Sequence, residues 1–390
     1  MNTNELMVGL IKSGVIGDKV TFQRMAAKVA REMDAEGNRE LAQTIRNLLK
    51  QEASFSLQKA NFTPSKLTAN DLSLPIDSET KFHLADKVAP ETNEQPPILN
   101  NSINEKINEF IVSVEKRNEL KKFGLKPASS MILFGPPGCG KTLAAKHIAS
   151  VLGLPLFTAR CDALVSSYLG STAKNIRALF EYASNQPCVL FLDELDALAK
   201  ARDDQHELGE LKRVVVALLQ NIDDLPEHTV LISASNHENL LDSAVWRRFA
   251  YRIEIGLPDI KIREHLFERL LNEHFPRLDV AYDSALLSKG LSCAFIEQIC
   301  ERALRHSILF NNNEFDKTFL VKSIMESQGE KFDDPDQMTG KLAKLIRNCD
   351  ARVFTVRKIA SLLSISPAKV SRLTKENKLS LNQNNTDEAS

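Results

Sequence analysis

The sequence predicts an α/β protein in which a parallel sheet is covered by helices, with helical units before and after it in the chain. Between residues 131 and 255, short apolar runs alternate with helical stretches, a pattern typical of parallel strands joined by helical crossovers. On both sides of this region, apolar residues recur at helical spacing instead. The expected strands are Met131–Phe134, Leu154–Thr158, Cys188–Leu192, Val230–Ser235 and Tyr251–Ile255.

The overall composition is that of a soluble globular protein and excludes a fibre or a fully disordered chain. Of 390 residues, 43% are hydrophobic and 26% are charged, and no apolar run approaches the ~20 residues of a membrane helix. The first ten residues lack the basic and then apolar order of a secretory signal. Six widely spaced cysteines without a CxxC pair exclude a disulfide framework and a zinc site. We therefore expect reduced thiols, a cytoplasmic protein and no membrane partner.

Residues 1–52 are expected to form an N-terminal helical interaction unit. Thr21 can cap an apolar helical stripe that Gly37 and Asn38 separate from a second one. The apolar faces fit contact with a partner, although packing of these helices on each other explains part of the pattern. Residues 53–100 are rich in Ser, Thr, Asn and Pro and predict a linker with one short ordered piece. The expected α/β domain spans 101–258, and a helical region spans 259–335.

The strongest chemical signal is a glycine-rich loop between the first expected strand and a helix that starts at Leu143. It matches GxxxxGK[ST] in full, and the strand–loop–helix context is the one that the motif requires. Glycines allow phosphate oxygens to approach the backbone N–H groups and the helix N-terminus. Lys141 would reach the β- and γ-phosphates of a nucleotide, and the Thr142 hydroxyl would hold Mg²⁺. The expected nucleotide-binding residues are Gly135, Pro136, Pro137, Gly138, Cys139, Gly140, Lys141, Thr142, Leu143 and Asp193.

Two further strands end in polar side chains, at the edge where parallel sheets place their ligands. Asp193 and Glu194 follow the run Cys188–Leu192, and Asn236 follows Val230–Ser235. Asp193 is expected at the Mg²⁺ ion, and Glu194 is expected as the general base that polarises the attacking water. Asn236 can orient the same water. Taken alone, the acids also fit the first turn of a helix, and the amide fits an ordinary turn.

A pair of arginines, Arg247 and Arg248, lies in an otherwise apolar stretch before the last expected strand. Two unpaired guanidinium groups are costly to bury, so they should lie at a surface that receives an anion. The γ-phosphate in a neighbouring subunit is one such anion, because an arginine supplied in trans stabilises transition-state charge. In that case the active site spans two subunits, and a monomer is nearly inactive.

The ordered motifs GPPGCGKT, VLFLDELDAL, SASN and WRRF together resemble the AAA ATPases, a branch of the P-loop NTPases. The resemblance covers roughly residues 100–330, and Gly290–Phe295 is similar to a turn of the AAA lid domain. It implies ATP and Mg²⁺ as cofactors, a large α/β subdomain, a helical lid, and a homo-oligomeric ring that is usually a hexamer. ATP would then lie between neighbours, with Arg247 and Arg248 reaching the adjacent site.

The same resemblance implies a substrate pore loop at Tyr168, Leu169 and Gly170, just after the second expected strand. Their aromatic–aliphatic–glycine order matches the loop that grips a polypeptide in the central channel of such rings. An aromatic face contacts substrate side chains regardless of their sequence. A tyrosine packed within its own loop is the alternative. The charged stretch Arg202–Glu207 is either a second channel loop or solvated surface.

The near-neutral chain has a strongly basic tail. Residues 341–380 hold ten Lys or Arg against two acids, a net charge of +8. Such an excess is typical of a surface for nucleic acid or another acidic partner, and it also fits a solvated tail.

Apolar spacing in the tail predicts a helix-turn-helix, in which Ser366 caps the second helix and Pro367 lies in its first turn. Ser364 departs from the glycine that is usual in such a turn. Residues 351–378 are thus candidates for DNA contact, and two short helices packed on the lid are the alternative. The second helix would present four polar side chains to a DNA groove and its phosphates, namely Lys369, Ser371, Arg372 and Lys375.

The sequence therefore favours an ATP-hydrolysing AAA ring motor that remodels or unfolds a protein client through a central pore. A helical unit followed by one AAA module also resembles bacterial AAA ATPases, some of which are similar to partners of subtilisin-like serine proteases. The chain has no GxSxG or other hydrolase motif of its own, so proteolysis would belong to such a partner. The alternative function is that of a nucleotide-gated, DNA-associated regulator that acts through the helix-turn-helix.

Overall fold

The computed structural model describes residues 74–77, 81–89, 96–160, 164, 169–199, 208–276 and 278–375. The chain divides into two units, Met1–Leu72 and Ser73–Ser390, and all described residues lie in the second unit. The expected N-terminal helical unit, residues 1–52, therefore lies outside the described residues.

A six-stranded sheet forms the centre of the α/β part, with strand order β1-β3-β4-β5-β2-β6. The last five strands along the chain pair in parallel, and only β1 runs antiparallel, against β3. The predicted parallel sheet is confirmed, and each expected strand lies within two residues of its predicted bounds. The strands are β1 Ala85–Val88, β2 Ser130–Phe134, β3 Leu156–Ala159, β4 Cys188–Leu192, β5 Thr229–Ser235 and β6 Tyr251–Glu254.

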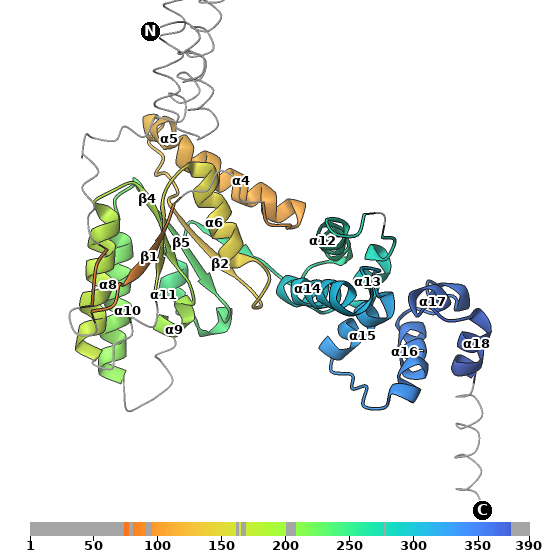
Figure 1. Cartoon of the computed structure of the whole chain (residues 1–390). Coiled ribbons are helices and arrows are strands. Elements are labelled where there is room, and N and C mark those ends of the chain that lie inside the picture. Colours follow the sequence, from red (N-terminus) through yellow and green to blue (C-terminus); the bar gives the residue numbers. More distant parts are fainter. Residues whose placement is uncertain are drawn as a thin grey trace, which may run out of the picture. The chain divides into compact units, whose positions relative to one another are not determined.

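Helices cover both faces of the sheet, which explains why its central strands are apolar without alternation. In β4, Cys188, Leu190 and Leu192 share a core with α8 and α10, while Val189 and Phe191 are equally buried on the opposite face, toward α6. Figure 1 shows α8 and α10 together on one side of the sheet and α6 on the other. The helices of this part are α4 Asn101–Glu115, α5 Arg117–Lys122, α6 Lys141–Leu152, α8 Leu169–Ser184, α9 Leu195–Ala199, α10 Leu208–Asp223 and α11 Ser243–Trp246, with a 3₁₀ turn at Glu238–Leu240.

The edge strand β1 lies in the segment whose composition predicts a linker with one short ordered piece. Leu84 and Ala85 are fully buried, and Ala85 pairs with Ala159 of β3. Four residues on a sheet edge are too few to show a hydrophobic period, so the sequence gives no strand signal there.

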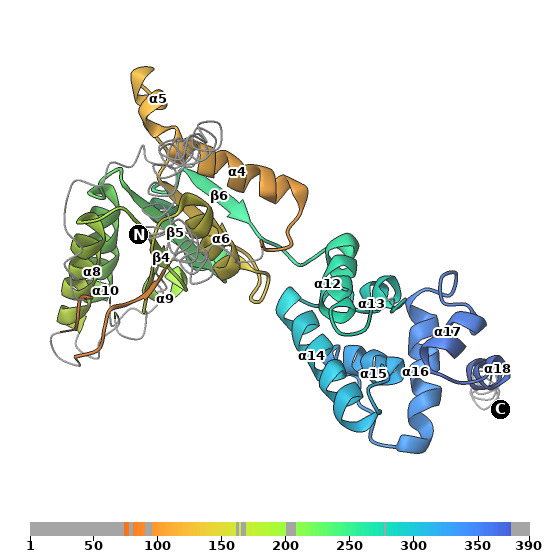
Figure 2. The same cartoon turned by 45° about the horizontal axis from the view of Figure 1, so that its top comes forward.

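The remaining helices share one hydrophobic core that runs from Ile262 to Val370. α17 packs on α15, and α16 contacts both α13 and α15, so the tail helices pack on the lid helices. α16 also runs across the predicted division between 335 and 341. Among the described residues, no helix is long and apolar enough to cross a bilayer. Figure 2 shows these helices, α12 Ile260–Asn272, α13 Ala281–Leu287, α14 Cys293–Phe310, α15 Lys317–Ser327, α16 Pro335–Cys349, α17 Val356–Leu362 and α18 Pro367–Lys375.

The turn between α17 and α18 is closed by backbone hydrogen bonding. Ser364 takes a left-handed backbone with φ of 51°, and the Ile365 N–H donates to the Ala360 carbonyl at 3.0 Å. This hydrogen bond spans six residues and ends α17. Ser364 occupies the position of this turn where glycine is usual. Ser366 accepts a hydrogen bond from the Lys369 N–H at 3.3 Å, and α18 starts at Pro367, as predicted. The tail therefore contains two short helices joined by a tight turn, and these helices pack on the lid, while the helix-turn-helix assignment stays a prediction.

Candidate functional site

A cavity of about 320 Å³ lies where β2, β4 and β5 end. The strand order places β5 between β2 and β4, so the segments that follow these three strands meet at one edge of the sheet. Residues predicted from separate motifs therefore converge, and three residues of α14 join them. The cavity is lined by Pro137, Gly138, Gly140, Lys141, Thr142, Leu143, Asp193, Glu194, Asn236, Cys293, Ala294 and Glu297.

Two glycines of the loop occupy positions that exclude a side chain. Gly135 has a φ of 135°, and a Cβ there would lie 2.3 Å from the Ile255 carbonyl oxygen. Gly138 has a φ of 72°, and a Cβ there would lie 2.8 Å from Ser292 Oγ in the lid. A larger residue at either place would push the loop away from the sheet or from the lid.

Lys141, the first residue of α6, has its ammonium group held within the loop. The side chain is buried, and Nζ donates to the carbonyls of Gly135 and Pro136 at 2.8 Å each. Burial lowers the pKa of Lys141, while the neighbouring Cys139 and two acids act in the opposite direction. A cation in this position can exchange its carbonyl acceptors for phosphate oxygens at little structural cost.

Thr142 and Asp193 both line the cavity and contact each other. Thr142 Oγ1 donates to Asp193 Oδ2 at 3.0 Å, and the Glu194 N–H donates to Asp193 Oδ1 at 2.9 Å. Hydroxyl and carboxylate oxygens are the ligands that Mg²⁺ prefers. Among the described residues no group of three or more His, Cys, Asp or Glu could hold a metal ion by itself. A divalent ion at this pair would therefore complete its shell with water and ligand oxygens, as Mg²⁺ commonly does.

Glu194 is exposed in the cavity and has a strained backbone. Its φ of 51° lies in the left-handed region, which costs a non-glycine residue of order 1–3 kcal/mol. The start of α9 helps to hold this conformation, because the Ala197 N–H donates to the Glu194 carbonyl at 2.8 Å. Strain of this kind tends to occur where a side chain must be aimed at a functional site.

Asp196 is a site residue that sequence reasoning missed. It is 9% exposed, and its Oδ1 accepts from Ser235 Oγ at 2.9 Å and from the Asn236 N–H at 3.2 Å. The His237 N–H in turn donates to Ser235 Oγ at 3.1 Å. These bonds tie the end of β5, and with it Asn236, to the segment that carries Glu194. The sequence offered one signal for it, because Asp196 is the third acid in the run Asp193-Glu194-Leu195-Asp196.

The lid closes one side of the cavity through the start of α14. The Ala294 N–H donates to the Gly138 carbonyl at 3.0 Å, and Cys293 and Glu297 line the cavity one helical turn apart. Cys293 lies in the segment Gly290–Phe295 that resembles the AAA lid turn, but neither it nor Glu297 was predicted at the site, because their contact with the loop joins distant parts of the chain. Three predicted residues do not line the cavity and instead shape the loop, namely Gly135, Pro136 and Cys139. Burial raises the pKa of the Cys139 thiol.

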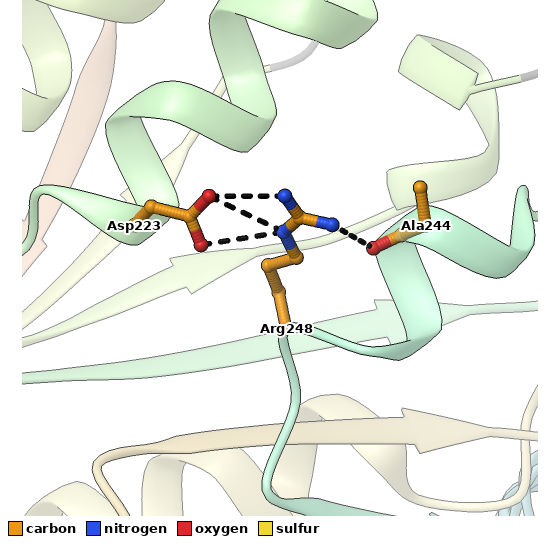
Figure 3. A network of polar contacts seen from close by, with 3 residues as sticks. All are labelled: Asp223, Ala244 and Arg248. Carbon is orange, nitrogen blue, oxygen red and sulfur yellow. Dashed lines mark hydrogen bonds and ion pairs between the residues drawn. The ribbon is translucent and has the colours of Figure 1, made fainter.

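Neither of the two arginines lines this cavity, and they differ from each other. Figure 3 shows the contacts of Arg248 with Asp223 and Ala244. Arg248 donates from Nε and Nη2 to the Asp223 carboxylate at 3.1–3.3 Å and from Nη1 to the Ala244 carbonyl at 3.1 Å. Arg247, at the end of α11, is exposed and has no ion pair with any described residue. Arg248 is therefore half-buried and paired, whereas the Arg247 side chain is exposed, and the predicted role of both residues stays a prediction.

The predicted pore loop is only partly described. Tyr168 lies outside the described residues, as do Arg202–Glu207. Leu169 and Gly170 are the first two residues of α8. The substrate role of these three residues stays a prediction.

Comparisons with known proteins agree with this geometry. The profile of the family described as "ATPase family associated with various cellular activities (AAA)" matches residues 131–257. The "Uncharacterized AAA family ATPase y4kL" of Sinorhizobium fredii (strain NBRC 101917 / NGR234) is 38% identical over 312 residues, 79% of this chain and 90% of that protein. The "Probable 26S proteasome regulatory subunit 10B" of Caenorhabditis elegans is 34% identical over 191 residues, 47% of each chain. This chain therefore belongs to the AAA family of ATPases, which bind and hydrolyse ATP.

Proposed function

We propose that the protein is a Mg²⁺-dependent ATPase that assembles into a ring, of six subunits in our proposal, and remodels or unfolds a protein client. The observation that carries the proposal is the convergence of Lys141, Thr142, Asp193, Glu194 and Asn236 on one cavity. These five side chains supply a cation that binds phosphate, two metal ligands, a general base and an amide that can orient water. That set is sufficient for phosphoryl transfer to water.

Each side chain is assigned one role. Lys141 binds the β- and γ-phosphates, and Thr142 and Asp193 hold Mg²⁺ through oxygens that already lie 3.0 Å apart. When bound, the ion neutralises charge that develops on the phosphate oxygens. Glu194 accepts the proton of the attacking water, and Asn236 orients that water. Asp196 keeps Asn236 in place through the Asn236 backbone N–H.

The arginine pair supports a site that is completed by a neighbouring subunit. Neither Arg247 nor Arg248 lines the cavity of its own chain. A guanidinium that acts in trans has to be free to reach an anion outside its own fold. Arg247 is exposed and unpaired among the described residues, whereas Arg248 would first have to release Asp223. We therefore assign the main contact with the neighbour's γ-phosphate to Arg247 and a supporting one to Arg248.

The client is proposed to be a polypeptide that is engaged by Tyr168, Leu169 and Gly170 in a central channel. The similarity to a proteasome regulatory subunit supports a protein client. Residues 1–52 would recruit the client or a partner, and a subtilisin-like protease is the partner that we would look for first. We place this activity in the cytoplasm.

A trapping experiment tests this function. The full-length Glu194→Gln protein, loaded with ATP and purified from its native host, should retain a polypeptide client or a protease. The client is then offered to wild-type protein and to the Tyr168→Ala and Tyr168→Phe variants. Tyr168→Ala should keep basal ATPase activity and lose remodelling, while Tyr168→Phe, which keeps the aromatic face, should retain both. Full remodelling by Tyr168→Ala would refute the pore assignment.

A second candidate function is DNA-associated regulation through α17 and α18. The observation that favours it is the tight turn at Ser364, which joins the two helices of the basic tail and supports their assignment as a helix-turn-helix. Duplex DNA should then stimulate ATP hydrolysis. Removing residues 341–390 would not test this cleanly, because Phe354, Ile359 and Val370 belong to the lid core. Surface substitutions are the sharper test.

A further inference from the structure

The basic residues of the tail differ in their surroundings, which the sequence could not show. Lys344 and Arg347 of α16 are half-buried. Lys341 pairs with Glu330 at 2.7 Å, and Lys358 pairs with Asp283 of the lid at 2.5 Å, so these two side chains act within the fold. Five others are exposed and have no ion pair with any described residue. These five define the basic face, which consists of Arg352, Arg357, Lys369, Arg372 and Lys375.

The basic face is built on the helix-turn-helix itself. Lys369, Arg372 and Lys375 recur every three residues along α18 and so share one stripe of that helix. Val370, on another side of α18, is fully buried and fixes the helix to α17 and α16. The stripe is therefore held outward by apolar packing.

Arg352 and Arg357 come from the preceding turn and helix. The Arg352 N–H donates to Asp350 Oδ1 at 2.9 Å, which shapes the turn before α17 while the guanidinium stays exposed. Arg357 is the second residue of α17 and is also exposed. In a helix-turn-helix the first helix crosses the nucleic-acid backbone and the second enters a groove. Arg352 and Arg357 are therefore placed to contact the backbone, and the stripe on α18 is placed to enter the groove.

We propose that the basic face is a binding site for duplex DNA, in which Lys369 and Arg372 point to base edges of the major groove and Arg352, Arg357 and Lys375 contact phosphates. This assignment rests on the second candidate function and gives it a specific surface. A helix fits the major groove of B-form DNA, whereas the major groove of double-stranded RNA is too narrow for side chains to read.

The lack of aromatic side chains argues against a single strand as the ligand. Proteins that bind single-stranded nucleic acid stack its bases on exposed aromatic rings. Phe354 is the one aromatic residue between positions 341 and 380, and it is fully buried. The basic face offers charge and hydrogen-bond donors but no stacking platform, which suits a base-paired backbone.

The magnitude of the expected effect follows from counterion release. Each phosphate contact contributes about −0.9 to the slope of log affinity against log salt concentration. Three phosphate contacts give a slope of about −2.7, which corresponds to roughly a 40-fold loss of affinity between 50 and 200 mM salt. Removing one contact should reduce the slope by about 1.

The test measures binding of the full-length protein to a labelled duplex of about 30 base pairs, long enough for several turns of the groove, by fluorescence anisotropy across this salt range. Arg357→Gln should reduce the salt slope by about 1, and Arg372→Gln should weaken binding with a sequence-dependent loss. Lys341→Gln is the matched control, because it removes the same charge from the same tail at a side chain that Glu330 already engages. It should leave the slope unchanged. ATP hydrolysis without DNA, measured on each variant, reports on folding and on the ATPase independently.

The possible outcomes separate the hypotheses. Equal losses in Lys341→Gln and Arg357→Gln would mean diffuse attraction and overturn the assignment of this face. Salt-dependent duplex binding that survives all five substitutions would also overturn it, while leaving DNA association itself in place. No salt-dependent duplex binding, or stronger binding of a single strand, an RNA duplex or an acidic protein, would remove DNA as the ligand. None of these outcomes affects the ATPase assignment, which fails only if purified protein does not hydrolyse ATP.

Discussion

The cavity at the end of the sheet and the basic face at the end of the chain hold their charged groups in opposite ways. In the cavity, Lys141 is buried against two carbonyls, and Asp193 and Asp196 each accept two hydrogen bonds from neighbouring groups. On the basic face, Arg357 and Arg372 are exposed and have no ion pair with a described residue.

The difference follows from what each region has to do. Catalytic groups stabilise a transition state best when they are oriented before it forms, which requires partners within the fold. Attraction to a chain of phosphates depends on the number of available charges and tolerates imprecise placement. Substitutions in the cavity should therefore have steep and mutually dependent effects, while those on the basic face should have small effects that add.

Glu194→Gln should have the largest effect on turnover. The amide keeps the shape of the carboxylate but cannot accept the proton of water, so kcat should fall roughly 10³- to 10⁴-fold, the upper part of the range for a general base. ATP binding should persist, whereas Lys141→Ala should lose it. Isothermal titration with ATP and steady-state hydrolysis separate the two variants. A Glu194→Gln protein with near wild-type kcat would exclude Glu194 as the base.

The adjacent residues Arg247 and Arg248 repeat this contrast, because Arg248 is paired with Asp223 whereas Arg247 is exposed and has no ion pair with a described residue. Arg247→Ala should lower kcat by roughly 10³-fold with unchanged ATP affinity, because an arginine supplied in trans contacts the transition state in the neighbouring subunit's active site. Arg248→Ala should cost less turnover and should also destabilise the fold, since it leaves Asp223 without its partner. Mixing Arg247→Ala with Glu194→Gln subunits should restore part of the activity if the site spans two chains. Absence of any rescue would argue for action within one chain.

Asp196→Ala should reduce kcat by roughly 10- to 100-fold without a comparable change in ATP affinity, because it releases the backbone of Asn236. Asp196→Asn retains an acceptor oxygen and should preserve most of the activity. If Asp196 acts only by positioning, its effect should largely disappear in an Asn236→Ala background. Fully additive losses in the double variant would show that Asp196 has a separate role.

Ser364→Gly should have the smallest effect and the opposite sign. Glycine adopts a φ of 51° without the clash of a Cβ, so the protein should gain roughly 1 kcal/mol of unfolding free energy. Ser361→Gly is the control, because Ser361 lies inside α17, where glycine should destabilise by about 0.5–1 kcal/mol. Thermal unfolding of the full-length protein compares them. A loss of stability in both variants would contradict the role of the Ser364 turn.

The strands and the glycine-rich loop could be predicted because each carries a local pattern. Buried strands such as Cys188–Leu192 are continuous apolar runs, and the loop has glycines at positions where the structure leaves no room for a Cβ. The position of Asn236 beside Glu194 could also be inferred, since parallel strands end at one edge. Local pattern and sheet topology therefore account for most of the site.

The remainder depends on contacts between distant parts of the chain. No sequence period links Glu297 of the lid to the glycine-rich loop or Arg248 to Asp223, and β1 is too short for an alternating pattern to emerge. The tail charge was visible, but its division into Lys341 and Lys358, which pair within the fold, and five exposed cations required coordinates. The departure at Ser364 was recognisable from the sequence, and its left-handed backbone explains why glycine is the usual choice.

The shared core of lid and tail has a consequence for how such a chain can evolve. Phe354, Ile359 and Val370 fill the same interior as Ile262 and Leu266, so loss of the tail would leave lid residues without their packing partners. Replacement of the tail as a separate module during evolution is therefore disfavoured, and the lid and the tail should be inherited together. Divergence in what the tail recognises is left to the outward positions of α18, where substitutions do not disturb the common interior.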